Sequence, residues 1–95
     1  MSGEIPHILD SQTVAAFIGI GNQTDKDGDF SRAEMYYLKA VETSERVSGK
    51  LHGETGLVLI NLAKFYRKYG HYEQAMAVEH RIDTITSLYL EDQCT

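Results

Sequence analysis

The chain has 95 residues, of which 42% are hydrophobic and 24% are charged, and its formal net charge at pH 7 is −5. This length allows one small domain at most, and the acidic charge opposes binding to nucleic acid or to an anionic membrane. No apolar run is long enough to span a membrane, and the single cysteine, Cys94, cannot form an internal disulfide, so we expect a cytoplasmic protein.

Residues 1–10 are expected to form an N-terminal extension, without the basic and apolar regions of a signal peptide. Residues 11–27 are expected to form the first helix, with Ser11 or Thr13 as a plausible N-cap. Apolar residues recur there broadly at helical spacing, namely Val14, Phe17, Ile18 and Ile20.

The stretch "DKDGDF", residues 25–30, opens like a calcium-binding loop, because Asp25, Asp27 and Asp29 would fill its first three ligand positions. Such a loop also needs Gly at its sixth position and a bidentate Glu at its twelfth, where this chain has Phe30 and Tyr36. The sequence therefore predicts an acidic turn without a metal, in which Asp29 can cap a helix that begins near Phe30.

Residues 29–49 are expected to form the second helix, and Gly49 follows where glycine commonly ends a helix. The charged residues of this segment lie mostly off one apolar or small stripe, which indicates one buried face. The stripe consists of Phe30, Ala33, Tyr37, Ala40, Val41, Ser44 and Val47.

Residues 54–70 and 71–90 are expected to form the third and fourth helices. No convincing period-two run competes with this all-α prediction. The predicted core face of the third helix consists of Leu59, Leu62, Ala63 and Tyr66. The predicted inward residues of the fourth are Tyr72, Ala75, Ile82, Ile85 and Tyr89.

The chain repeats itself at an offset of 42 residues. Residues 25–33 fall on residues 67–75, so that Gly28 meets Gly70, Ala33 meets Ala75, and each copy has an aromatic residue two positions after its glycine. The acidic cluster occurs in the first copy only, which indicates that the shared residues are structural. We therefore divide the chain into a first repeat, 11–49, a second repeat, 53–90, and a C-terminal tail, 91–95.

These residues resemble the tetratricopeptide repeat. The first copy matches its pattern at Phe17, Ile20, Gly21, Gly28, Phe30, Ala33, Tyr37 and Ala40. The second copy matches it at Leu59, Leu62, Ala63, Tyr66, Gly70, Tyr72 and Ala75, and departures from it stand at Thr24, Glu79 and Ile82. The resemblance implies four antiparallel helices, arranged as two hairpins and stacked as a short right-handed α-solenoid.

The common tetratricopeptide repeat has 34 residues, whereas the period here is 42. The longer period resembles the subtype of kinesin light chains, although His52-Gly53 stands where that subtype often has His-Pro. The terminal repeats also resemble those of ubiquitin-ligase substrate receptors. These resemblances imply a non-catalytic adaptor or scaffold that binds a protein partner.

The resemblance also implies a concave groove that binds a peptide. Its positions in this chain are Ile18, Asn22, Asp25, Lys26, Ile60, Asn61, Lys64, Arg67 and Lys68. Asn61 would grip the peptide backbone, because an amide both donates and accepts hydrogen bonds. Lys64, Arg67 and Lys68 would favour an acidic segment or a C-terminal carboxylate. The alternative is that these cations only complement the end of the helix dipole.

The sequence supports an enzymatic function less well than a binding function, and we expect no cofactor and no metal ion. The pair His52-x-Glu54 begins like a zinc-deaminase signature, but no Pro-Cys-x-x-Cys follows it. Cys94 falls in the expected tail, which makes it a poor candidate nucleophile.

A third hypothesis is assembly, because two repeats are fewer than such arrays usually need for stability. The fourth helix is apolar near its end, with Ile82, Ile85, Leu88, Tyr89 and Leu90, and "IPHIL" near the start is apolar too. We expect either a capping unit of a longer array or a homo-oligomer that forms through Ile82, Ile85 and Tyr89.

Overall fold

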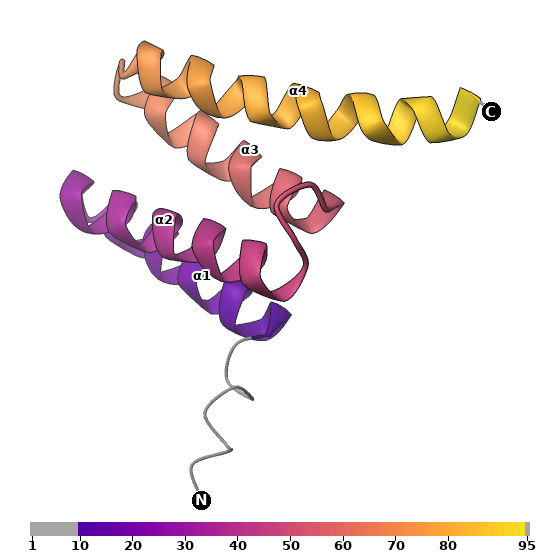
Figure 1. Ribbon diagram of the computed structural model, residues 1–95. Helices are drawn as coiled ribbons and strands as arrows, with labels where there is room; N and C mark the ends of the chain where they lie inside the picture. Colours follow the sequence, from indigo (N-terminus) through magenta and orange to yellow (C-terminus); the bar gives the residue numbers. More distant parts are fainter. Residues whose placement is uncertain (1–9, 95) are drawn as a thin grey trace, which may run out of the picture.

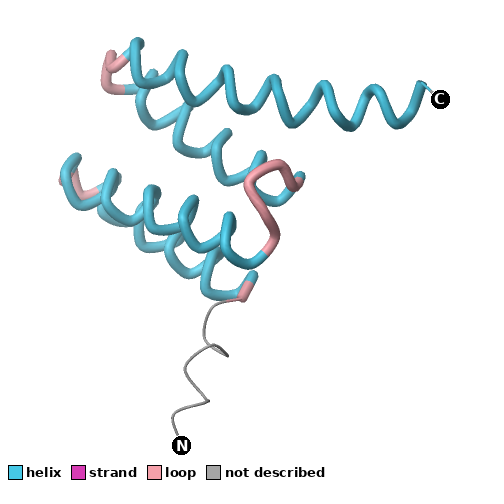
Figure 2. Tube along the Cα trace, viewed as in Figure 1, coloured by secondary structure: helices cyan, strands magenta, loops and turns pink. Residues whose placement is uncertain are grey.

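The computed structural model describes residues 10–94 and contains four helices there. They are α1 (Ser11–Lys26), α2 (Phe30–Val47), α3 (Gly53–Lys68) and α4 (Tyr72–Cys94). Short loops join them, and the described residues include no strand, which confirms the all-α prediction (Figure 2). The apolar "IPHIL" stretch lies outside the described residues.

The four helices form two hairpins that stack in chain order (Figure 1). The first hairpin consists of α1 and α2, the second consists of α3 and α4, and α2 packs against α3 to join them. Helices α1 and α4 therefore lie at opposite ends of the stack. Helix α4 continues to Cys94, past its predicted end at residue 90, and projects beyond the start of α3 (Figure 1).

Side-chain caps and glycines set the helix boundaries. The Asp29 carboxylate accepts a hydrogen bond from the backbone N–H of Arg32 at 3.1 Å, which confirms the predicted cap of α2. At α1 the prediction of Ser11 or Thr13 is wrong, because Asp10 has the extended conformation of a cap and its carboxylate accepts from the N–H of Thr13 at 3.0 Å. Three turn glycines adopt positive φ: Gly28 at 82°, Gly49 at 110° and Gly70 at 78°.

Helices α2 and α3 supply most of the core, as the apolar stripes predict. The buried hydrophobic residues include Val14, Ala33, Tyr37, Ala40, Val41, Val58, Leu59, Leu62, Ala63, Phe65, Tyr66, Ala75 and Ile85. Four residues that the pattern placed on inward stripes are instead partly exposed, namely Ile20 (41%), Val47 (38%), Tyr72 (56%) and Tyr89 (43%). For Ile20, Tyr72 and Tyr89 the reason is that α1 and α4 are the end helices, so no further layer covers their outer sides.

One buried polar contact fixes the register between the hairpins. The hydroxyl of Thr55 at the start of α3 donates to the carbonyl of Gly49 at 2.7 Å, and the hydroxyls of Ser44 and Thr55 lie 2.8 Å apart. Both side chains are fully buried. Since the Thr55 proton is used by Gly49, Ser44 donates to Thr55, and both hydroxyls are satisfied.

Aromatic rings join the hairpins at the other end of α2. Phe30 stacks on Phe65 with ring centroids 4.8 Å apart and on His71 at 4.7 Å, and Tyr69 meets it edge-on at 5.2 Å.

None of the helices in the described range is long and apolar enough to cross a bilayer.

Candidate functional site

A polar hollow of about 200 Å³ lies where α1 faces α3, with α2 at its floor. It is lined by Asn22, Asp25, Tyr37, Asn61, Lys64, Phe65 and Lys68. Five of the residues in the predicted binding groove therefore come together here, namely Asn22, Asp25, Asn61, Lys64 and Lys68. They come from both repeats, so the hollow exists only because the two hairpins stack.

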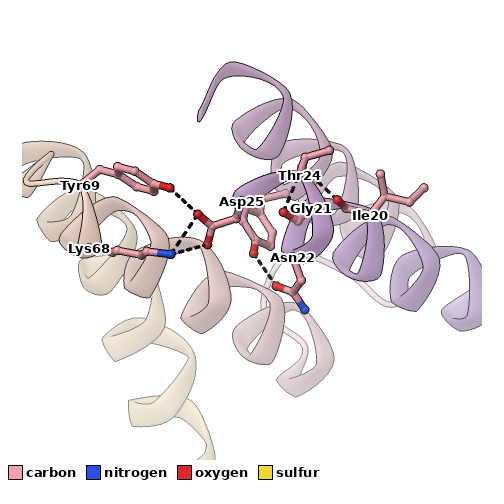
Figure 3. A network of polar contacts seen from close by, with 8 residues as sticks. Ile20, Gly21, Asn22, Thr24, Asp25, Lys68 and Tyr69 are labelled. Carbon is pink, nitrogen blue, oxygen red and sulfur yellow. Dashed lines mark hydrogen bonds and ion pairs between the residues drawn. The ribbon is translucent and has the colours of Figure 1, made fainter. Parts of the chain in front are cut away.

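Asp25 is the centre of the polar contacts in this hollow. The ammonium of Lys68 lies 3.1 Å from both carboxylate oxygens of Asp25, and the hydroxyl of Tyr69 donates to one of them at 2.5 Å (Figure 3). The hydrogen bond to Asp25 is the largest of the effects that raise the pKa of Tyr69. The side chain of Asp25 is only 15% exposed, whereas that of Lys68 is 57% exposed.

These contacts give the acidic "DKDGDF" stretch a role within the stack. Asp25 ties α1 to α3 and Asp29 caps α2. Within residues 10–90, no three His, Cys, Asp or Glu side chains group together as metal ligands would.

The side chain of Tyr37, on α2, orients the side chain of Asn22, on α1. The Tyr37 hydroxyl donates to Oδ1 of Asn22 at 2.5 Å, so the amide nitrogen of Asn22 is directed away from this contact. Burial is the main cause that raises the pKa of Tyr37, and the charge of Asp25 adds to it. Tyr37 and Phe65 line the hollow but were not predicted as site residues. The apolar spacing indicated a core position for Tyr37, whereas Phe65 was not among the predicted core residues, and both are buried.

Asn61 and Lys64 lie on the same side of α3 as Lys68. The Asn61 amide donates to the carbonyl of Leu57 at 3.1 Å, one turn earlier in the same helix, which leaves its oxygen to accept from a ligand. Lys64 is exposed, and among the described side chains it has no ion-pair partner. Its charge is therefore available, whereas the charge of Lys68 is offset by Asp25.

Four of the predicted groove residues do not line the hollow, namely Ile18, Lys26, Ile60 and Arg67. Arg67 instead forms a two-point ion pair with Glu79 of α4, at 2.5 and 2.8 Å, and lies 5.9 Å from the ring centre of Tyr72. This pair lowers the pKa of Glu79. Neighbouring helix positions point about 100° apart, so Arg67 faces α4 while Lys68 faces α1.

A second, apolar groove of about 380 Å³ runs between α3 and α4 near the end of the stack. Ile60 lies in it, together with Ile82, Ile85 and Tyr89, the three residues proposed for self-association. Leu57, Thr86, Leu90, Gly53 and Gly56 complete its lining, and none of these residues is charged. The backbone N–H of Gly53 donates to the hydroxyl of Tyr89, which fixes α4 across the start of α3.

The geometry of two stacked helix hairpins agrees with the comparisons to known proteins. Residues 12–79, from α1 to the beginning of α4, match the family model described as the tetratricopeptide repeat. No curated protein and no solved structure gave a significant match. Repeats of this kind generally mediate protein–protein interactions. Because the match covers more than half of the chain, the chain belongs to the tetratricopeptide repeat family.

Proposed function

We propose that the chain is a non-catalytic adaptor that binds an extended acidic peptide in the hollow between α1 and α3. The observation that carries this proposal is the placement of Lys64, whose charge has no partner in the described structure, beside two asparagine amides. An extended peptide presents a row of backbone N–H and C=O groups, which amides recognise, and a carboxylate on the peptide would complement Lys64.

Each side chain of the hollow has a distinct role in this proposal. Asn61 accepts a hydrogen bond from the peptide backbone, while Asn22, held by Tyr37, donates to a peptide carbonyl. Lys64 pairs with a peptide carboxylate. Lys68 contributes less to peptide binding, because its ammonium already forms an ion pair with Asp25, which competes with a peptide carboxylate. Asp25 therefore positions the side chain of Lys68 and also limits the affinity of the hollow for an acidic peptide.

The 42-residue period supports placement in the long-helix subtype found in kinesin light chains. As a member of this subtype, the chain would act as part of a cargo adaptor or of a ubiquitin-ligase substrate receptor. The peptide experiment does not depend on which of these is correct.

The test is fluorescence anisotropy with a panel of labelled peptides of equal length that carry increasing numbers of Asp and Glu. We expect affinity to rise with peptide acidity and to fall about tenfold in the Lys64→Glu, Lys68→Glu double variant, because two charge-assisted contacts are reversed. Lys64→Glu alone should also weaken binding, and its matched control is Lys39→Glu on the exposed side of α2, which should leave the affinity unchanged.

A second variant, Asp25→Asn, distinguishes the hollow from general charge attraction. It frees Lys68 within the hollow, so we expect affinity for the acidic peptides to increase several-fold. If Lys64→Glu alone and Lys39→Glu, which change the net charge by the same amount, weakened binding equally, the peptides would be responding to net charge, and the assignment of the hollow would be wrong.

A further inference from the structure

Each end of the stack has one exposed surface without charged side chains. From Ser11 to Thr24 the helix α1 contains no Asp, Glu, Lys or Arg, although Ala15, Ala16, Gly19 and Ile20 are exposed there. At the opposite end, no charged residue lines the apolar groove between α3 and α4. Exposed uncharged surfaces of this kind commonly mark interaction sites.

Comparison of the two repeats shows what covers the surface equivalent to this groove in the first hairpin. Shifting by 42 residues carries Ala40 and Ser44 of the first hairpin onto Ile82 and Thr86 of the open groove. In the first hairpin both positions are fully buried, and Thr55 of α3 bonds to Ser44. Helix α3 therefore covers, in the first hairpin, the surface that stays open in the second.

The same shift identifies the matching surface. The counterpart of α3 in the first repeat is α1, and Val58 and Leu62 correspond to Ala16 and Ile20. Val58 and Leu62 are buried in the stack, whereas Ala16 and Ile20 are exposed on the outer side of α1. The chain thus carries both halves of one interface at opposite ends.

We propose that the outer side of α1 of one copy seats in the α3–α4 groove of a second copy and so continues the 42-residue stack from chain to chain. Ile20 would then lie in the groove beside Ile60 and Ile82, as Leu62 lies in the core within one chain. Because the two surfaces differ, the contact is head-to-tail, and it leaves one α1 surface and one groove free at the ends of each assembly.

This contact is weaker than the one within the chain. Beyond Ile20, Gln23 stands where Phe65 stands in α3, and Asp27 stands where Tyr69 stands. The aromatic stack that joins the hairpins around Phe30 therefore has no equivalent between copies. Arg67, at the counterpart of Asp25, would face both Lys26 and Asp27, whose charges offset each other. We expect reversible, concentration-dependent association.

Two single substitutions test the head-to-tail geometry. Ile20→Glu places a charge on the α1 surface, and Leu57→Glu places one on the groove, where Leu57 is 65% exposed. Ala16→Glu is a second block of the α1 surface that removes no buried side chain. Met76→Glu is the matched control, since Met76 is also exposed but lies in neither surface. Far-UV circular dichroism verifies that each variant remains helical.

Sedimentation equilibrium from about 10 μM to about 1 mM covers the range expected of a small interface. The unsubstituted chain and Met76→Glu should exceed the mass of two 10.7 kDa copies as concentration rises, whereas each blocked variant alone stays monomeric. A 1:1 mixture of Ile20→Glu and Leu57→Glu should form dimers and nothing larger, because one intact α1 surface meets one intact groove.

Three results would overturn the proposal. The unsubstituted chain could remain monomeric at the highest concentration, or the mixture could fail to form dimers. If Leu57→Glu were monomeric while Ile20→Glu still dimerised, two grooves would face each other across a two-fold axis instead. None of these results bears on peptide binding between α1 and α3, which is measured separately.

Discussion

Replacing Gly21 of α1 with alanine tests how closely the two helices of the first hairpin pack. Gly21 is buried, and a Cβ added there would lie 2.9, 3.0 and 3.2 Å from three carbons of the Tyr37 ring. The ring is 3% exposed, packs 5.1 Å from the ring centre of Phe65, and is tied through its hydroxyl to Asn22. It therefore has little room to move away from the added methyl group.

Two opposing effects determine the expected free energy. Alanine favours a helix over glycine by about 1 kcal/mol. Overpacking a well-packed core costs about 1–3 kcal/mol. With Tyr37 held on several sides, we expect the overpacking term to prevail, and the difference of the two terms is a loss of up to about 2 kcal/mol of unfolding free energy for Gly21→Ala. For a domain of this size, the melting temperature would fall by up to about 15 °C.

Gly19→Ala is the matched control in the same helix. A Cβ at Gly19 would meet no atom within 4 Å, so only the helix-propensity gain remains, and thermal melts followed at 222 nm should show stabilisation. If Gly21→Ala melted at or above the Gly19→Ala variant, the close contact with Tyr37 would not limit packing. In a Tyr37→Leu background the penalty of Gly21→Ala should disappear.

Two further predictions concern the junction between the hairpins. Thr55→Val should lose about 1–3 kcal/mol in urea unfolding with an unchanged m-value, because it leaves the buried hydroxyl of Ser44 without an acceptor; a loss below about 0.5 kcal/mol would contradict this. The pKa of Glu54 lies below its usual 4.5, chiefly because its carboxylate accepts from the Ser48 hydroxyl. A carboxylate whose pKa is lowered by folding stabilises the folded state at pH values above its unfolded pKa, and this stabilisation is lost as the pH falls through its folded pKa. Glu54→Gln should therefore flatten the decline in melting temperature below about pH 4.5, and an unchanged decline would refute this.

The sequence predicts the helices well because their signals are local. Apolar spacing identified the buried stripes of α2 and α3, and the glycines with positive φ stand where the pattern ended each segment. The error at the start of α1 was also local, since Asp10 lies one residue before the candidates considered and is an equally good cap. The exposure of Tyr72 and Tyr89 was missed because spacing alone does not show whether an end helix has a neighbour.

The ion pairs of Lys68 and Arg67 were harder to predict because each joins residues of different helices. Lys68 and Asp25 are separated by 43 positions, and Arg67 and Glu79 belong to different helices. The sequence placed Lys64, Arg67 and Lys68 in one basic strip. The structure gives Lys68 and Arg67 separate carboxylate partners, which leaves only Lys64 of the three unpaired within the described chain.

The two repeats differ most where the hollow lies. Positions shared between them, such as Ala33 and Ala75, are buried and serve the stack in both copies. At the position of Asp25 the second repeat has Arg67, and at the position of Tyr37 it has Glu79, so a contact between hairpins in the first repeat is replaced by an ion pair within one hairpin in the second. A Glu side chain does not occupy the space of the Tyr37 ring, which is consistent with Ala63 replacing Gly21. The surface that we propose for a partner is therefore specified by residues that the repeat pattern leaves free to vary.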